Sequence, residues 1–169
     1  MRGSLLRHLR IFDRVAYLVG GRPYPLNVIE HGVLRRNRRP PLRLRRALRP
    51  SDARLRGAPR RLDPRIHFAL NCGARSCPPV RSYDADRLDA QLDLATGSYL
   101  EAESGVDSRR RRVTLPRLMR IYRADFGRRR AQLEFAARYL PELRGWIGDA
   151  EVRIGYGRFD WTAAGPASA

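Results

Sequence analysis

Residues 63–79, with the sequence DPRIHFALNCGARSCPP, contain both cysteines of the chain and one of its three histidines. Within this stretch, apolar side chains recur at every second position, at Ile66, Phe68 and Leu70. This alternation predicts a β-strand with one buried face, because successive side chains of a strand point to opposite faces. We expect this strand to lie at the centre of a short sheet and to carry His67.

The residues after this strand predict a turn. Gly73 directly follows Cys72, and glycine readily adopts the positive φ that a tight turn needs. Loops held at the end of a rigid sheet often carry functional side chains. We therefore expect a site at this turn, and its candidate residues are Asn71, Cys72, Arg75 and Cys77.

One hypothesis for this site is thiol catalysis, with Cys72 as the nucleophile and a histidine as its base. His67 lies five residues before Cys72, about 16 Å away along an extended strand, which is too far for direct proton transfer. His31, on a helix expected over residues 26–36, is the better candidate base. Its neighbour Glu30 is a candidate binding residue. Adjacent helical residues point about 100° apart, so we do not expect Glu30 to orient His31.

Two other hypotheses remain open. Cys72 and Cys77 can form a disulfide, either structural or redox-active, if their Cα atoms lie within about 7 Å of each other. Alternatively, the chain is a non-enzymatic binding or scaffold domain whose cysteines are small buried residues. The spacing of cysteines and histidines matches no common zinc site, and we expect neither a metal nor a cofactor.

The composition is that of a single, strongly basic domain of 169 residues with a net charge of +18. All 35 basic residues are arginine, and residues 1–63 hold 17 of them against four acids. Such a positive field attracts polyanions weakly and without sequence preference. No helix-turn-helix, zinc finger or RNA-binding aromatic motif accompanies the charge. The sequence therefore does not predict specific nucleic-acid binding, and it identifies no other partner.

The sequence contains no apolar run long enough to span a bilayer. Residues 1–14 are basic but lack the apolar core of a secretory signal. As written, the sequence predicts a cytoplasmic protein, and a signal peptide encoded upstream would instead predict export.

The rest of the chain predicts an α+β fold, with a short, mainly antiparallel sheet packed against several helices. Apolar residues at helical spacing predict helices over residues 26–36, 84–100, 115–126 and 128–140. Other patterns predict strands over residues 11–19 and 109–115, a turn over 23–25, and two short strand-like pieces within 151–161. Arginine and proline predominate in residues 35–62, which is typical of a long surface loop, here with a short helical turn.

Several stretches stand in a recognisable order: GGR at 20–22, LNVIEHGVLR at 26–35, HFALNCGARSCPP at 67–79, IYRADFG at 121–127 and FDW at 159–161. Together they resemble a bacterial and plant family, the domain of unknown function 547. The resemblance implies one domain over residues 11–162, a remnant of upstream structure at 1–10 and a frayed tail at 163–169. Family members begin with a further helical stretch containing a Trp-x-Asn-x-Tyr-Asn pattern, and nothing here corresponds to it. The resemblance thus implies an N-terminally truncated member, and it implies a fold rather than a chemistry.

Overall fold

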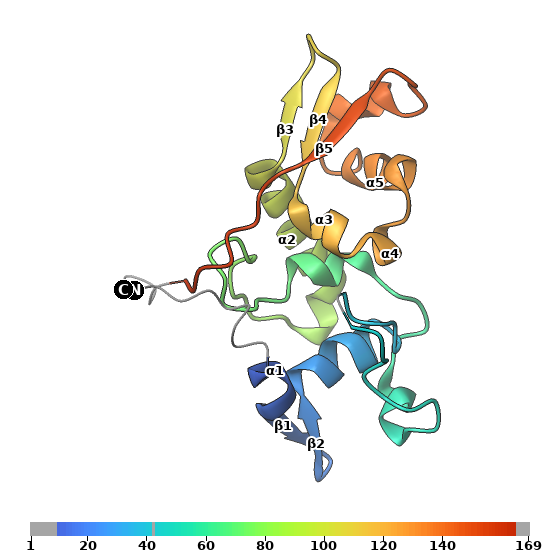
Figure 1. The fold of residues 1–169 in the computed structure, drawn as a ribbon, viewed down its shortest axis with the longest axis vertical. Helices are drawn as coiled ribbons and strands as arrows, with labels where there is room; N and C mark the ends of the chain where they lie inside the picture. The colour runs from blue at the N-terminus through green and yellow to red at the C-terminus, as the bar shows by residue number, and fades with distance from the viewer. Residues whose placement is uncertain (1–9, 42, 165–169) are drawn as a thin grey trace. The chain divides into compact units, whose positions relative to one another are not determined.

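The computed structural model describes residues 10–41 and 43–164. The chain comprises two compact units, residues 1–63 and residues 64–169, and the predicted domain spans both. Each unit combines helices with a small sheet, which confirms the predicted α+β class (Figure 1). Apart from Arg10, the predicted remnant at the start of the chain lies outside the described residues.

In its described residues, 10–41 and 43–63, the first unit contains one hairpin and three helices of different types. Its elements are α1 (Ile11–Arg14), β1 (Ala16–Val19), β2 (Arg22–Pro25), the π-helix η2 (Val28–Leu34) and the 3₁₀-helix η3 (Ala53–Gly57). β1 and β2 pair antiparallel. The strand predicted over residues 11–19 is therefore wrong in its first half, which is helical, and the turn predicted over residues 23–25 is a strand.

Two consecutive glycines explain the hairpin. Gly20 and Gly21 have φ values of +56° and +73°. A two-residue turn of type I′ requires a positive φ at both positions, and its twist matches that of the paired strands. Sequence reasoning missed β2 because two of its four residues, Pro23 and Pro25, are prolines, which are uncommon in strands.

The helix predicted over residues 26–36 is confirmed, but most of it winds as a π-helix. The N–H of Arg35 bonds to the carbonyl of Glu30, and the N–H of Asn37 bonds to the carbonyl of Gly32. Both bonds join residues five apart, as in a π-helix, and such turns often occur at functional sites.

One asparagine holds the arginine- and proline-rich segment that follows η2. Asn37 accepts the N–H of Leu48 at 3.0 Å and donates to the carbonyl of Leu48 at 2.9 Å. Leu48 is buried and lies against Gly32. The short helical turn predicted in this segment is η3, where Asp52 caps the helix by accepting the N–H of Arg54.

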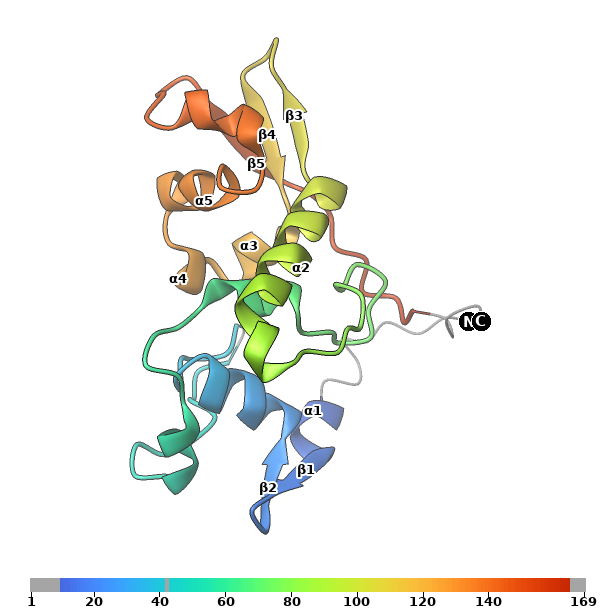
Figure 2. The same cartoon turned by 180° about the vertical axis from the view of Figure 1, so that it is seen from behind.

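The second unit packs several helices against a three-stranded sheet. Its elements are η4 (Pro64–Phe68), η5 (Ala85–Arg87), α2 (Leu88–Glu103), β3 (Gly105–Asp107), β4 (Arg112–Leu115), α3 (Arg117–Ile121), α4 (Arg123–Phe126), α5 (Arg129–Ala136), η6 (Pro141–Trp146) and β5 (Arg153–Tyr156). β4 lies in the middle of the sheet, antiparallel to β3 and parallel to β5. Figure 2 shows the long helix α2 running up to the start of β3.

The core of the second unit joins the helices to the sheet. Leu100 of α2, Leu115 of β4, Met119 of α3 and Leu143 of η6 are fully buried within it. Burying a side chain of this size contributes about 1.5–3 kcal/mol. Phe68 of η4 belongs to the same cluster, so core packing positions the segment that leads to the cysteines.

Most other predicted helices and strands are present, but they begin or end at residues other than those predicted. The helices predicted over residues 84–100 and 128–140 correspond to η5 with α2 and to α5, and the strand predicted over 109–115 corresponds to β4. The helix predicted over residues 115–126 is interrupted, because Leu115 belongs to β4 and Tyr122 separates α3 from α4. Of the two strand-like pieces predicted within residues 151–161, only the first is a strand, β5.

The strand predicted from the alternation of Ile66, Phe68 and Leu70 is wrong. These residues begin in the 3₁₀-helix η4, and the N–H of Leu70 bonds to the carbonyl of Ile66. Pro64 favours this helix, because it has the φ of a first helical turn and lacks an N–H that a strand would use. His67 is buried together with its two apolar neighbours Ile66 and Phe68, so burial does not alternate along the segment as it would in a strand with one solvent face. His67 therefore lies on a helix, not on a central strand.

Candidate functional site

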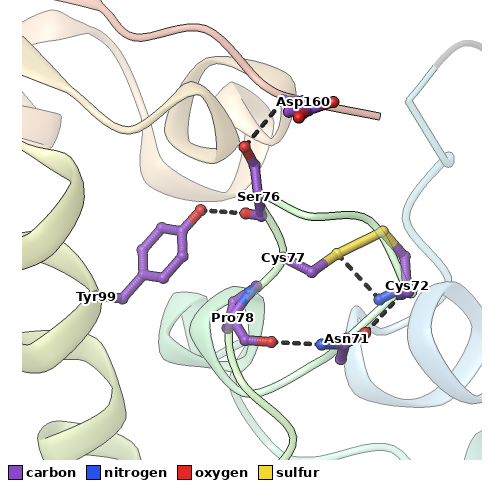
Figure 3. The surroundings of a disulfide bond; sticks show 8 residues. Asn71, Cys72, Ser76, Cys77, Pro78, Tyr99 and Asp160 are labelled. Atoms are coloured by element: carbon purple, nitrogen blue, oxygen red, sulfur yellow. Dashed lines mark hydrogen bonds between the residues drawn. A yellow bond between two sulfur atoms is a disulfide. The ribbon is translucent and has the colours of Figure 1, made fainter. Parts of the chain in front are cut away.

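The two cysteines form a disulfide that closes a short turn in the second unit. The Cα atoms of Cys72 and Cys77 are 6.3 Å apart, within the usual range for a disulfide. Figure 3 shows the bridge across the turn, with Asn71 and Pro78 beside it. Both cysteines are half-buried, and neither is a free thiol. Among the hypotheses for the two cysteines, the structure agrees with a disulfide between them.

The backbone of the turn is held by a side-chain amide and by a sulfur atom. Asn71 donates from Nδ2 to the carbonyl of Pro78 at 2.6 Å and accepts the N–H of Gly73 at 2.5 Å. The N–H of Cys72 lies 3.1 Å from Sγ of Cys77. Gly73 has a φ of +82°, as predicted for this turn. Asn71 therefore uses both ends of its amide inside the turn.

Residues 160–164, the C-terminal segment, pair with the turn through backbone hydrogen bonds. Ala74 and Ala163 form an antiparallel bridge. Beside this bridge, the N–H of Arg75 donates to the carbonyl of Thr162 at 3.0 Å, and the N–H of Ala164 donates to the carbonyl of Gly73 at 2.8 Å. The predicted frayed tail is thus wrong for its first two residues, and residues 165–169 lie outside the described residues.

Ser76, between the two cysteines, makes three hydrogen bonds to residues outside the turn. Its N–H bonds to the carbonyl of Asp160, and its hydroxyl accepts the N–H of Asp160 at 2.9 Å. Its carbonyl accepts the hydroxyl of Tyr99 from α2 at 2.7 Å (Figure 3). Burial raises the pKa of Tyr99, so this hydroxyl remains a donor. Thr162 donates two hydrogen bonds to the carboxylate of Asp160 and thereby lowers the pKa of Asp160.

His67 is buried beside an aspartate from another helix. Its Nε2 lies 2.9 Å from Oδ2 of Asp125 of α4, and both side chains are at most 1% exposed. Its ring stacks on that of Tyr122, with ring centroids 3.8 Å apart. An ionised carboxylate only accepts hydrogen bonds, so His67 donates its Nε2–H. These contacts fix the ring and join η4 to α4.

In the first unit, His31 belongs to a buried cluster with Glu30 and Arg35. Nη1 of Arg35 lies 2.9 Å from Nδ1 of His31, and Oε1 of Glu30 lies 3.4 Å from the same nitrogen. Arginine can only donate, so Nδ1 of His31 is the acceptor and Nε2 carries the proton. Oε1 of Glu30 lies near the ring, and the hydrogen-bond contact on Nδ1 is with Arg35, so the expectation that Glu30 does not orient His31 stays a prediction.

The structure brings four of the predicted site residues together. Asn71, Cys72, Arg75 and Cys77 share the disulfide turn, His67 lies in the same unit, and Glu30 and His31 belong to the other unit. Arg75 is exposed, and its backbone N–H takes part in the network of the turn. The catalytic roles expected for Cys72, His31 and His67 stay predictions.

Sequence reasoning missed four residues that hold these side chains in place: Ser76, Tyr99, Asp125 and Asp160. Asp125 and Asp160 occur in motifs that resemble the family, and this is the signal that singles them out. Their partners His67 and Ser76 lie 58 and 84 residues away in the sequence, so no local pattern predicts the contacts.

Charge, metal ligation and hydropathy add three observations. The first unit carries 17 Arg against four acids, a net charge of +13, and the second carries 18 Arg against 13 acids, a net charge of +5. Within residues 10–41 and 43–164, no group of three or more His, Cys, Asp or Glu side chains is arranged to hold a metal ion. None of the helices in the described part of the chain is long and apolar enough to cross a bilayer.

Comparison with known proteins places the chain in a family. No curated protein and no solved structure matches it. The model of one family, described as "Protein of unknown function, DUF547", matches residues 3–100, which include the disulfide turn. The motifs at 121–127 and 159–161 lie beyond the matched residues. Since the match covers more than half of its length, the chain belongs to the family of proteins of unknown function DUF547.

Proposed function

We propose that this chain is a non-enzymatic protein-binding domain in which the Cys72–Cys77 disulfide is structural. The observation that carries the proposal is the disulfide itself, which closes the turn that holds residues 160–164. Nucleophilic catalysis requires a thiolate, and a sulfur atom in a disulfide is not one. Closing the turn is a structural role that accounts for both cysteines without catalysis.

The energetics support a structural role. Closing a loop of this length is worth about 2 kcal/mol in the chain-entropy account of disulfides. The closed turn then presents the backbone groups of Arg75 and Ser76 to the C-terminal segment. The free energy gained in the turn therefore also stabilises the segment that follows β5.

The surroundings of His67 support the same proposal. Its Nε2 is engaged by Asp125, and its ring lies against Tyr122. Buried polar groups of folded proteins are normally hydrogen-bonded, as His67 is here. His67 thus has a packing role that needs no substrate.

The surface of the first unit supports binding. Tyr17, Leu18 and Val19 of β1 are exposed, although large apolar side chains are usually buried. The net charge of +13 in residues 1–63 also favours weak binding of polyanions without sequence preference, which falls as salt is added.

The first experiment tests the state of the cysteines in the intact protein purified without reductant. We expect a mass lower than that of the reduced chain by two hydrogen atoms, and no adduct after treatment with iodoacetamide. The same protein, reduced and unfolded, is the control and takes up two adducts. Rapid labelling of Cys72 in the native, unreduced protein would overturn the proposal.

A thiol-dependent site is the second candidate, with Cys72 as the nucleophile and His31 or His67 as its base. It requires a dithiol that transfers two hydrogen atoms to the cysteine pair and is itself oxidised to a disulfide. The contact between the N–H of Cys72 and Sγ of Cys77 favours a thiolate on Cys77 after this reduction. The reduction potential separates the candidates: a structural disulfide is expected below about −300 mV, and a redox site above it.

A further inference from the structure

The β1–β2 hairpin is closed to further pairing on the side of β2. Its two-residue turn makes Val19 and Arg22 a hydrogen-bonded pair, and hydrogen-bonded and non-hydrogen-bonded pairs then alternate along the hairpin. Pro23 and Pro25 consequently occupy non-hydrogen-bonded positions, where a backbone N–H would point away from β1. Because proline has no N–H, the outer edge of β2 offers no donor at these two positions.

The outer edge of β1 has the opposite character. Leu18 pairs with Pro23 and Ala16 pairs with Pro25, so both are at non-hydrogen-bonded positions and direct their N–H and C=O groups outward. In the described part of the chain, β1 has β2 as its one neighbouring strand (Figure 1). The edge thus presents two donors and two acceptors in the spacing of a β-ladder.

The side chains along this edge are apolar and accessible. Tyr17, Leu18 and Val19 are 63%, 77% and 56% exposed. Proteins usually protect an open strand edge with charged residues, proline or a covering element. In the hairpin β2 has such protection, whereas among residues 10–41 and 43–164 no charged residue, proline or covering strand protects β1, which is the arrangement expected of an edge that receives another strand.

We infer that the outer edge of β1 binds an extended, acidic segment of another protein by strand addition. This inference rests on the proposed function and names the surface and the kind of partner. In this mode the main chain supplies the hydrogen bonds, and side chains on alternate positions supply selectivity. The bound segment forms backbone hydrogen bonds with Ala16 and Leu18, and its side chains lie alternately beside Leu18 on one face and beside Tyr17 and Val19 on the other.

The exposed groups of the edge distinguish a polypeptide from other ligands. The carbonyls of Ala16 and Leu18 need N–H donors, which a phosphate group or a lipid headgroup without N–H cannot provide. Charge then favours an acidic segment, because exposed Arg14 precedes the strand, Arg22 lies opposite its last residue, and residues 1–63 carry a net charge of +13. The same charge disfavours pairing of β1 with a second copy of this chain.

The test uses the full chain and a fluorescein-labelled peptide of alternating valine and glutamate, followed by fluorescence anisotropy. We expect the wild-type protein to bind this peptide, and not to bind the same peptide with N-methyl groups on alternate residues. Leu18→Pro removes an outward N–H and leaves the ladder with β2 intact, so it should bind about tenfold more weakly. Protected amides at Tyr17 and Tyr24 in hydrogen exchange verify that the hairpin still forms.

Two further variants make the result specific. Ala16→Pro repeats the loss of an outward N–H, and Val15 before it already has the extended conformation that a residue before proline prefers. Leu18→Ala keeps the N–H but has fewer side-chain carbons than Leu18→Pro. Stronger binding by Leu18→Ala than by Leu18→Pro therefore assigns the loss to the amide.

Three results would overturn the inference. Wild-type binding by both proline variants excludes strand addition at this edge. Loss of binding in Arg14→Glu together with unchanged binding in both proline variants shows that charge, and not strand addition, makes the contact. A dimer that Leu18→Pro abolishes and that excludes the peptide identifies a second copy as the occupant. The iodoacetamide experiment tests the proposed function separately. If the native disulfide does not react, the proposed function holds even when strand addition fails, whereas rapid labelling of Cys72 contradicts the proposed function itself.

Discussion

The backbone N–H of Cys72 donates toward Sγ of Cys77, the sulfur to which Cys72 is also covalently joined. The two cysteines are therefore not equivalent. An N–H donor stabilises negative charge on the sulfur that it faces, so the surroundings favour a thiolate on Cys77 once the bond is reduced. Sequence reasoning names Cys72, which directly precedes the glycine of the turn, as the candidate nucleophile, whereas the geometry favours the other sulfur.

The order of thiol reactivity follows from this contact. After mild reduction of the folded protein, limiting iodoacetamide should label Cys77 before Cys72, because only Cys77 faces the amide. Peptide mass spectrometry measures the two extents of labelling. The reduced and unfolded chain, in which both thiols are alike, serves as the control. Faster labelling of Cys72 would contradict the prediction.

Removing the disulfide should loosen the C-terminal segment. Cys72→Ser with Cys77→Ser is expected to lower the free energy of unfolding by about 2 kcal/mol, because the unfolded chain regains loop entropy. The amides of Arg75 and Ala164 should also exchange faster with deuterium, since they bond across the turn. Denaturant unfolding and hydrogen exchange check the two effects. Unchanged protection of both amides would show that the segment is held independently of the disulfide.

The carboxylate of Asp160 should titrate below its usual pKa of 3.8, because Thr162 donates two hydrogen bonds to its charged form. Because the pKa is lower in the folded state, these bonds contribute fully to stability at a pH above the unfolded-state pKa of 3.8. The contribution is lost as the pH falls through the lower pKa of the folded state. Carboxyl-carbon NMR measures the midpoint, and Asp160→Asn identifies the signal. A midpoint at or above 3.8 would contradict the assignment.

Gly32 should not tolerate a side chain. A Cβ atom at this position would lie 2.8 Å from Cδ1 of buried Leu48. Gly32→Ala is therefore expected to destabilise the protein by about 1–3 kcal/mol through overpacking. Gly57→Ala is the matched control, because nothing lies within 4 Å of a Cβ atom there. Thermal unfolding of both variants tests the difference, and equal midpoints would refute it.

The buried pair of His67 and Asp125 should contribute more to the free energy of unfolding than an exposed ion pair does. Asp125→Ala leaves the imidazole N–H without its carboxylate acceptor, and we expect a loss of about 3 kcal/mol. Glu134→Ala removes an exposed partner of Arg130 and should change stability by less than about 0.5 kcal/mol. Chemical denaturation of the two variants makes the comparison. Similar small losses in both would show that the buried pair does not stabilise the fold.

Local chemistry made several elements predictable from the sequence. The apolar face of residues 26–36 predicts a helix, and the charge imbalance of the first unit can be counted directly. The same kind of reasoning failed where two local signals competed. The alternation of Ile66 and Phe68 predicts a strand, whereas Pro64 favours a helical first turn, and the core buries both faces of the segment. Periodicity cannot describe a segment that is buried on all sides.

The sequence by itself determined the family, the α+β class and the positive φ of Gly73, because motifs, periodicity and glycine geometry are local properties. Only the tertiary structure decided the bonding of the cysteines and the partners of the turn. A disulfide requires two Cα atoms at a suitable distance, here 6.3 Å, and spacing alone does not establish that distance. Asp160 lies 84 residues beyond Ser76, and only packing of the whole unit brings the two together.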